Sequence, residues 1–196
     1  MENMEQQLIV LADGNLLHTE NKSRKEHQNL EILDFNDIPV LIKNVLDPKI
    51  EIKKENCHMF STGTSNNIKF KERISGTWLV HEFEKRAIES FCPYSKMFNS
   101  NANTAIAWAL GVTAAPEKKC DSIQIVVVSN SIGILLPLSM CQQRGVSVWA
   151  VWPGHMSIEF DSLALAEKIP VLNIQPMPEK RFSGNVFAAK FGQSCQ

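Results

Sequence analysis

Hydrophobic residues in this chain gather in short runs that end in polar, turn-forming residues. Residues 8–12 form one such run and end at Asp13, while residues 123–128 form another, interrupted at Gln124, and end at Ser129. Apolar runs of this length are typical of strands buried on both faces, the arrangement found in parallel sheets. Three further segments, apolar with single polar interruptions, are also predicted as strands: residues 57–61, 146–151 and 171–174.

Between these runs, apolar residues recur at the three- and four-residue spacing of amphipathic helices. The predicted helices cover residues 34–46, 75–91, 103–114, 132–143 and 159–168. Gly145 follows the fourth of them, in a position that suits a helix C-cap. Residues 18–29 are polar and charged, so we expect an exposed loop there.

Strands that alternate with helices of about 10–15 residues imply crossover connections and helices on both faces of a sheet. We therefore expect an α/β fold of three layers, in which helices cover a mostly parallel central sheet. Residues 1–174 are predicted to form a single domain. Residues 175–196 contain Pro176 and Pro178 and show no convincing period, so we expect a tail that is extended or bound to a partner.

The composition is that of an ordinary globular protein, with 44% hydrophobic and 21% charged residues. A formal charge of -1 gives no overall attraction to nucleic acid, so such binding needs a local basic patch. Five scattered cysteines without a C-x-x-C pair argue against a disulfide framework and favour a reducing compartment, so we expect a cytoplasmic or nuclear protein. Residues 123–141 are as long as a membrane span, but polar residues interrupt them, and no membrane association is expected.

Polar residues at the ends of the predicted strands are the candidates for chemistry, because ligands of parallel α/β proteins bind at the carboxyl edge of the sheet. Asp13 either holds a metal ion or caps the next turn through backbone hydrogen bonds, and its chain position favours neither. The turn Ser129-Asn130-Ser131 either cradles a phosphate or caps a helix, and it lacks the lysine and glycines of a P-loop. Residues 99–103 form a third polar cluster.

Basic and aromatic residues offer a second kind of candidate site, a surface for nucleic acid. Lys22, Arg24 and Lys25 form one of several small basic groups, each typical by itself of a solvated loop or helix face. Together, such groups could converge into a path for a phosphate backbone. The four tryptophans are instead predicted to belong to the hydrophobic core: Trp78, Trp108, Trp149 and Trp152.

Four segments resemble the NYN domains of the PIN-like ribonuclease superfamily. LIVLADGN (residues 8–15) is similar to the first NYN strand, which ends in an aspartate followed closely by an asparagine. VVSNSIGILLPL (127–138) resembles the central strand, polar turn and helix, and CQQRGVSVWAV (141–151) resembles the return into the next strand. SLALAEKIPVL (162–172) is similar to the closing helix and strand. The resemblance covers most of residues 8–174.

The resemblance implies a centre in which three or four carboxylates bind Mg²⁺ or Mn²⁺, and most of these acids are missing here. Asp13 is the acid that stands where the family has one. The family's acidic pair after the central strand falls on Ile132 and Ile134, and two earlier acids fall on Asn103 and Ala109. Isoleucine cannot coordinate a hard cation, which requires oxygen ligands. We expect no cofactor, with Mg²⁺ or Mn²⁺ needed if the chain is an active nuclease.

These features predict a degenerate, catalytically inactive NYN-like domain that binds RNA or serves as a protein-interaction subunit of an RNA-processing assembly. The residues expected to contact RNA are Asn15, Lys22, Arg24, Lys25, Asn103, Ser129, Asn130 and Ser131. One alternative is an active metal-dependent ribonuclease with relocated ligands, in which Asp13 is joined by Asp121, Glu82 or Asp161. The other is a structural scaffold or homo-oligomer whose apolar helix at residues 132–141 packs against a partner or a second copy.

Overall fold

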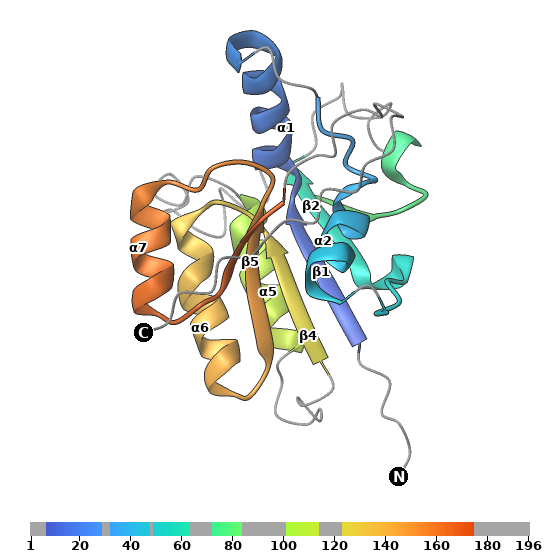
Figure 1. Cartoon of the computed structure of the whole chain (residues 1–196). Helices are drawn as coiled ribbons and strands as arrows, with labels where there is room; N and C mark the ends of the chain where they lie inside the picture. The colour runs from blue at the N-terminus through green and yellow to red at the C-terminus, as the bar shows by residue number, and fades with distance from the viewer. Residues whose placement is uncertain are drawn as a thin grey trace, which may run out of the picture.

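The computed structural model describes residues 7–28, 32–47, 49–62, 72–83, 101–113 and 123–174. Within these ranges, six parallel strands form one sheet in the order β3-β2-β1-β4-β5-β6. The strands are β1 (Gln7–Asp13), β2 (Cys57–Thr62), β3 (Leu79–Phe83), β4 (Ile123–Val128), β5 (Ser147–Trp152) and β6 (Val171–Asn173). Helices flank the sheet, which confirms the three-layer α/β/α fold expected from the sequence (Figure 1).

Strand β1 lies in the interior of the sheet, between β2 and β4. The register pairs Val10 with Cys57 on one side and with Val126 on the other. From β1 the order continues outward through β2 to β3, and then resumes on the other side of β1 with β4, β5 and β6. Successive strands are therefore added on one side of β1 up to β3 and on its other side from β4 onward. In open parallel sheets, ligands bind at the carboxyl edge beside such a reversal of strand order.

The helices of the described residues divide between the two faces of the sheet. Helices α1 (Gly14–Ser23) and α2 (Ile38–Leu46) contribute to the core on one face, and α5 (Asn101–Thr113), α6 (Leu135–Gln143) and α7 (Ile158–Ala166) contribute to the core on the other (Figure 1). A π-helical turn (Arg24–Gln28) extends α1, and a 3-10 turn (Ile132–Ile134) leads into α6. The site must therefore be sought where these two layers meet the strand tips.

The long apolar runs of β1 and β4, the latter with one polar residue at Gln124, follow from the presence of a core on each face. In β1, Val10 and Ala12 belong to the core under α1 and α2, whereas Leu11 belongs to the core under α5, α6 and α7. In β4, Val126 and Val127 divide between the two cores in the same way. Successive side chains of a strand point to opposite faces, so a strand with two buried faces needs an apolar residue at every position.

Most of the predicted elements are present, with ends that differ by a few residues. The strands predicted at 57–61, 123–128, 146–151 and 171–174 correspond to β2, β4, β5 and β6, and the helices predicted at 34–46, 103–114, 132–143 and 159–168 correspond to α2, α5, α6 and α7. Gly145 has a φ of 84° just after α6, a conformation that favours glycine and ends the helix as expected. No helix of the described ranges is long and apolar enough to cross a membrane.

The prediction of a loop at residues 18–29 is wrong, because α1 and its π-helical turn cover most of that segment. The helix has a polar sequence, and its buried residues are Gly14 and Leu17. Such a helix shows no apolar stripe for a periodicity argument to detect. Its start is instead fixed by Asp13, which caps it, and by Gly14, where a Cβ atom would lie 3.1 Å from the Phe60 carbonyl oxygen of β2.

The prediction of a helix at residues 75–91 is also wrong where the structure can test it. Residues Leu79–Phe83 form β3, which pairs in parallel with β2 and places His81 opposite Phe60. The spacing of Leu79 and Phe83 fits a helix as well as a strand, because residues four apart share a face in both. Hydrogen bonding to β2 stabilises this segment as a strand. The part of the predicted helix beyond Phe83 lies outside the described residues.

The tryptophans divide between core and surface, so their common assignment to the core is wrong for one of them. Trp78 and Trp152 are fully buried, and Trp78 donates a hydrogen bond from Nε1 to the Phe35 carbonyl oxygen at 2.9 Å. Trp149 is half-buried. Trp108, on α5, is 71% exposed. An indole so exposed is unusual enough on a helix to require its own explanation.

Candidate functional site

Asp13 ends β1 at the carboxyl edge of the sheet and is completely buried. Its Oδ1 atom accepts hydrogen bonds from the backbone N–H groups of Asn15 and Leu16, both at 3.0 Å. These are the first donors of α1, which have no partner within the helix. Of the two roles open to Asp13 from the sequence, the structure therefore supplies the geometry of the helix cap.

The turn after β4 lies beside Asp13, because Ala12 and Val128 are paired and each precedes its turn directly. Ser129 is buried, and its Oγ accepts the N–H of Ser131 at 3.2 Å. Its own N–H donates to the Val151 carbonyl oxygen of β5 at 3.2 Å. The Ser129 side chain therefore holds the turn itself, and α6 begins further along the chain, at Leu135, with Ile134 as its N-cap.

Helix α5 brings Asn103 to the same turn. Its Nδ2 atom donates a hydrogen bond to Oγ of Ser131, and the residue is 7% exposed. The expected convergence of three polar segments at the strand tips is thus present, with residues 101–103 of the third segment inside the described ranges. Asn15, Asn130 and Ser131 are half-buried around it. Their assignment to RNA binding stays a prediction.

Carboxylates do not converge on Asp13 in the part of the chain that the structure describes. No group of three or more histidine, cysteine, aspartate or glutamate side chains able to hold a metal ion occurs there. Of the proposed substitutes, Asp161 is exposed on α7, Glu82 lies on the outer strand β3, and Asp121 is outside the described residues. Ile134, which replaces a family acid, is fully buried in the core beneath α5 and α6.

Arg24 was expected to be solvated and to bind phosphate, and the structure contradicts the first part of this expectation. The residue is 5% exposed. Its Nε atom lies 3.0 Å from Oε1 of Glu20, and its guanidinium also donates to the Pro153 carbonyl oxygen. A guanidinium that is buried with its own carboxylate is a structural link between α1 and the segment after β5, so it is removed from the set of candidate RNA contacts.

Lys22 and Lys25 remain exposed and line a cleft of about 530 Å³ beside the outer half of α1. Two further basic residues, His18 and Arg73, line the same cleft. We call these four residues the basic cleft. Among the described residues that line it, Glu26 is the one carboxylate, and it stands against the positive charges of two lysines and an arginine.

The opposite wall of the basic cleft is partly apolar and is held in place by Asn21. The side chain of Asn21 exchanges two hydrogen bonds of 2.9 Å with the backbone of Leu33, one to its carbonyl oxygen and one from its N–H. This pair fixes the neighbouring Ile32, which is 53% exposed, as the accessible part of the apolar wall, while Phe35 lies buried behind it. Arg73 was not predicted to join the lysines, because it is distant in sequence. The side chain of Asn36 holds the Arg73 backbone beside the cleft, because its Nδ2 donates a hydrogen bond to the Arg73 carbonyl oxygen at 3.3 Å.

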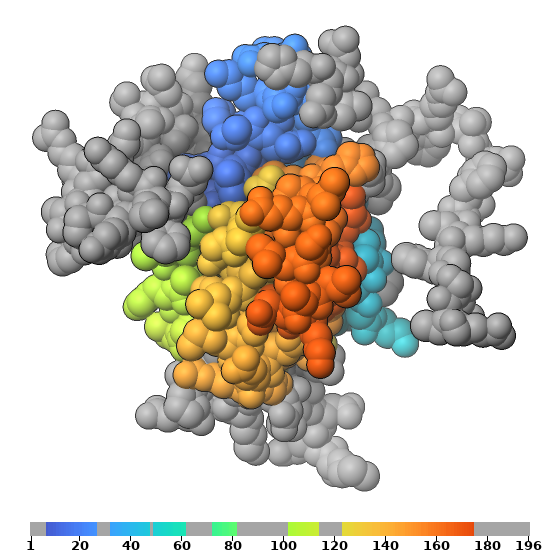
Figure 2. Space-filling view, turned by 90° about the vertical axis from the view of Figure 1, so that its left-hand side faces the viewer, coloured from blue at the N-terminus to red at the C-terminus, as the bar shows by residue number. Residues whose placement is uncertain are grey.

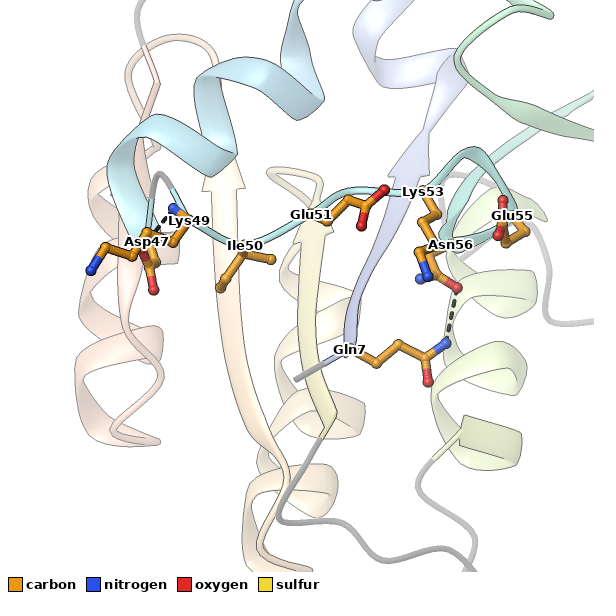
Figure 3. Close-up of a pocket in the computed structure, with 8 residues that line it drawn as sticks. All are labelled: Gln7, Asp47, Lys49, Ile50, Glu51, Lys53, Glu55 and Asn56. Carbon is orange, nitrogen blue, oxygen red and sulfur yellow. Dashed lines mark hydrogen bonds between the residues drawn. The ribbon is translucent and has the colours of Figure 1, made fainter. Parts of the chain in front are cut away.

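A larger cavity, of about 610 Å³, opens at the other end of β1, around Gln7 (Figure 3). It is lined by three carboxylates and two lysines: Asp47, Glu51, Glu55, Lys49 and Lys53. Figure 3 shows Asp47 and Lys49 at one end and Glu55 at the other, so these groups do not face a common point. Gln7 Nε2 donates to Asn56 Oδ1 at 2.9 Å, which joins β1 to the turn before β2. We assign no chemistry to this cavity.

Two histidines on neighbouring strands form a pair that was not expected from the sequence. His58 Nδ1 and His81 Nε2 lie 3.0 Å apart, and the ring of His81 also stacks on Phe60. Burial, and secondarily the nearby His81, lowers the pKa of His58 below its usual 6.5, and a backbone hydrogen bond at Glu55 opposes this shift. Burial also lowers the pKa of His81. At neutral pH the pair is therefore uncharged, with one ring donating and the other accepting.

No protein-family model, curated protein or solved structure matches this chain. The NYN-like pattern of its sequence thus stays a prediction. The fold itself defines a parallel α/β protein with the strand order 3-2-1-4-5-6, an order that is common among nucleotide-binding proteins. Because a fold of this kind supports many activities, the function has to be argued from the site.

Proposed function

We propose that this protein is a non-catalytic RNA-binding domain, a degenerate relative of the NYN domains, and that the basic cleft holds the RNA. The observation that carries the proposal is the gathering of Lys22, Lys25 and Arg73 around one cleft with an apolar wall. Exposed cations bind phosphates, and the exposed side chain of Ile32 offers an apolar contact for an unpaired base. The protein carries a formal charge of only -1, so attraction to a phosphate backbone depends on local groups such as this one.

The absence of catalysis in this proposal follows from the chemistry of the strand tips. Metal-dependent cleavage needs several oxygen ligands around the ion. The positions that correspond to the acids of the family hold Ile132, Ile134 and Ala109, and Ile134 is part of the core. Asp13, the acid that matches the family, already accepts two backbone hydrogen bonds as a helix cap. The site thus favours binding over hydrolysis.

A dinucleotide cofactor would be the usual ligand of this strand order, and the start of α1 argues against it. Such cofactors place their pyrophosphate on the free N–H groups at the start of the first helix, after a glycine-rich turn. Here the N–H groups of Asn15 and Leu16 already donate to Asp13, so they are not free to bind a phosphate. RNA held on the outer half of α1 does not need these N–H groups.

The test is a titration of fluorescently labelled single-stranded RNA, followed by anisotropy at several salt concentrations. Removing both Lys22 and Lys25 by alanine substitution should weaken binding and reduce the log–log salt slope by about 0.7 for each phosphate that is no longer bound. The matched control replaces Lys49 and Lys54, two exposed lysines outside the basic cleft, with the same change in charge. Equal losses in both variants would mean that the cleft is not the binding site, and no RNA binding at low salt would reject the function.

A further inference from the structure

Helices α5 and α6 form a surface without charge. Neither Asn101–Thr113 nor Leu135–Gln143 contains an aspartate, glutamate, lysine or arginine, although 21% of the chain is charged. Charged residues are normally the main constituents of an exposed helix face, and their depletion is a mark of the centres of protein interfaces. This surface covers the face of the sheet opposite to the one that α1 covers, and RNA binding does not explain it. Figure 2 shows α5 in green and α6 in yellow side by side.

Large apolar side chains are exposed on the same two helices. Trp108 and Val112 of α5 are 71% and 49% exposed, and Leu136 and Met140 of α6 are 67% and 50% exposed. Each pair is four residues apart, so each forms a stripe along its helix. The helices pack together, with Sγ of Cys141 3.8 Å from the Leu110 carbonyl oxygen. Tryptophan and methionine are enriched at interfaces between proteins.

The exposed side of α5 carries a large side chain, Trp108, and close to it a glycine, Gly111, over which another indole ring would fit. Gly111 follows Trp108 by three residues, which places it about 4.5 Å further along the same helix. It is exposed, and a Cβ atom built there would meet nothing within 4 Å. Two antiparallel copies of α5 that cross between these residues would each set an indole over the glycine of the other. This reciprocity, in which residue i contacts j and j contacts i, is the rule of a two-fold interface.

We propose that α5 and α6 form the interface of a homodimer, in which Trp108 of one copy packs over Gly111 of the second. A second copy suits this surface because it brings no charged group that would be buried without a partner. The small net charge of the chain also leaves little repulsion between copies. The interface lies apart from the basic cleft, so the proposal does not depend on the RNA-binding function.

Sedimentation velocity of the full chain over a wide range of concentrations tests the proposal. The wild-type protein should be a dimer at high concentration, and Trp108→Ala should weaken association by about 30-fold or more, as expected for a central tryptophan. Gly111→Leu should also abolish the dimer by filling the space, while the melting temperature of the monomer stays equal or rises, because leucine favours helix more than glycine does.

The control is Leu165→Ala, which removes an apolar side chain that is 79% exposed on α7 and should leave the dimer intact. Gly111→Leu separates loss of the interface from loss of the fold, since its effect on the fold has the opposite sign. A wild-type protein that stays monomeric at all concentrations overturns the proposal. So does a dimer that tolerates both Trp108→Ala and Gly111→Leu.

Discussion

Arg24 and Glu20 form a buried ion pair, with 3.0 Å between Nε and Oε1 and with side chains that are 6% and 19% exposed. The same guanidinium also binds the Pro153 carbonyl oxygen beyond β5. The pair therefore connects the outer part of α1, which carries the basic cleft, to the segment that follows β5. It fixes the cleft relative to the sheet.

Replacing Arg24 with alanine should lower the free energy of unfolding by about 3 kcal/mol, because it leaves Glu20 charged and without its partner. Denaturation in urea, monitored by circular dichroism, measures this change. Lys25→Ala removes the neighbouring exposed cation and should change stability by less than about 0.5 kcal/mol. If the two variants are equally stable, the Arg24 ion pair does not hold α1 in place.

Asp13→Ala should cost about 1 kcal/mol of stability, the usual effect of losing a helix N-cap, whereas Asp13→Asn should retain most of it. Asparagine keeps an oxygen that can accept the N–H groups of Asn15 and Leu16. Urea denaturation of both variants separates a cap from a metal ligand. If Asp13→Asn is as unstable as Asp13→Ala, and Mn²⁺ raises the melting temperature of the wild-type protein alone, Asp13 acts as a ligand.

Purified protein should leave single-stranded RNA intact in the presence of Mg²⁺ or Mn²⁺. The reason is that Ile132, Ile134 and Ala109 supply no oxygen where the related nucleases have acids. Gel analysis of a labelled RNA, with EDTA as the control for metal dependence, measures this. Cleavage that EDTA and Asp13→Ala both abolish would show that other carboxylates complete a metal centre, and the non-catalytic proposal would fail.

Stability should fall with acid because of the histidine pair. The pKa values of His58 and His81 are lowered in the folded protein, so below pH 6.5 the unfolded chain binds more protons than the fold does. The contribution of the pair is thus fully present above that pH and is lost as the pH falls through the folded pKa values. Urea midpoints between about pH 7.5 and about pH 5 should show this decline.

A double variant, His58→Gln with His81→Gln, should flatten that decline, since it removes both titrating rings. His155→Gln, at an exposed position, serves as the control and should leave the pH profile unchanged. A double variant that loses stability with acid as steeply as the wild type would place the effect on other groups.

The sheet could be predicted from the sequence because burial on both faces leaves a direct mark. Leu8, Val10 and Leu11 must all be apolar when each face of β1 is covered. The proximity of Asp13 and Ser129 followed from topology, since both end buried parallel strands. These inferences required no knowledge of which side chains touch.

The features that were missed depend on contacts between distant segments. Helix α1 is anchored by Leu17 and by the burial of Arg24, and neither leaves a periodic pattern. Arg73 joins the basic cleft through a backbone contact with Asn36. Trp108 lies among alanines and other apolar residues, so local composition predicts burial, although that side of α5 faces away from the sheet. Local sequence does not encode any of these relationships.

The interior position of β1 has a consequence for the order in which the protein is made. Gln7 pairs with Ile123, so a ribosome must synthesise more than half of the chain before β1 meets its second neighbour. Until then β1 can pair with β2, but its other edge has unpaired backbone groups and apolar side chains. A nascent chain that stalls between β3 and β4 would therefore expose an aggregation-prone strand edge. Protection of the nascent chain by a chaperone matters most during that interval.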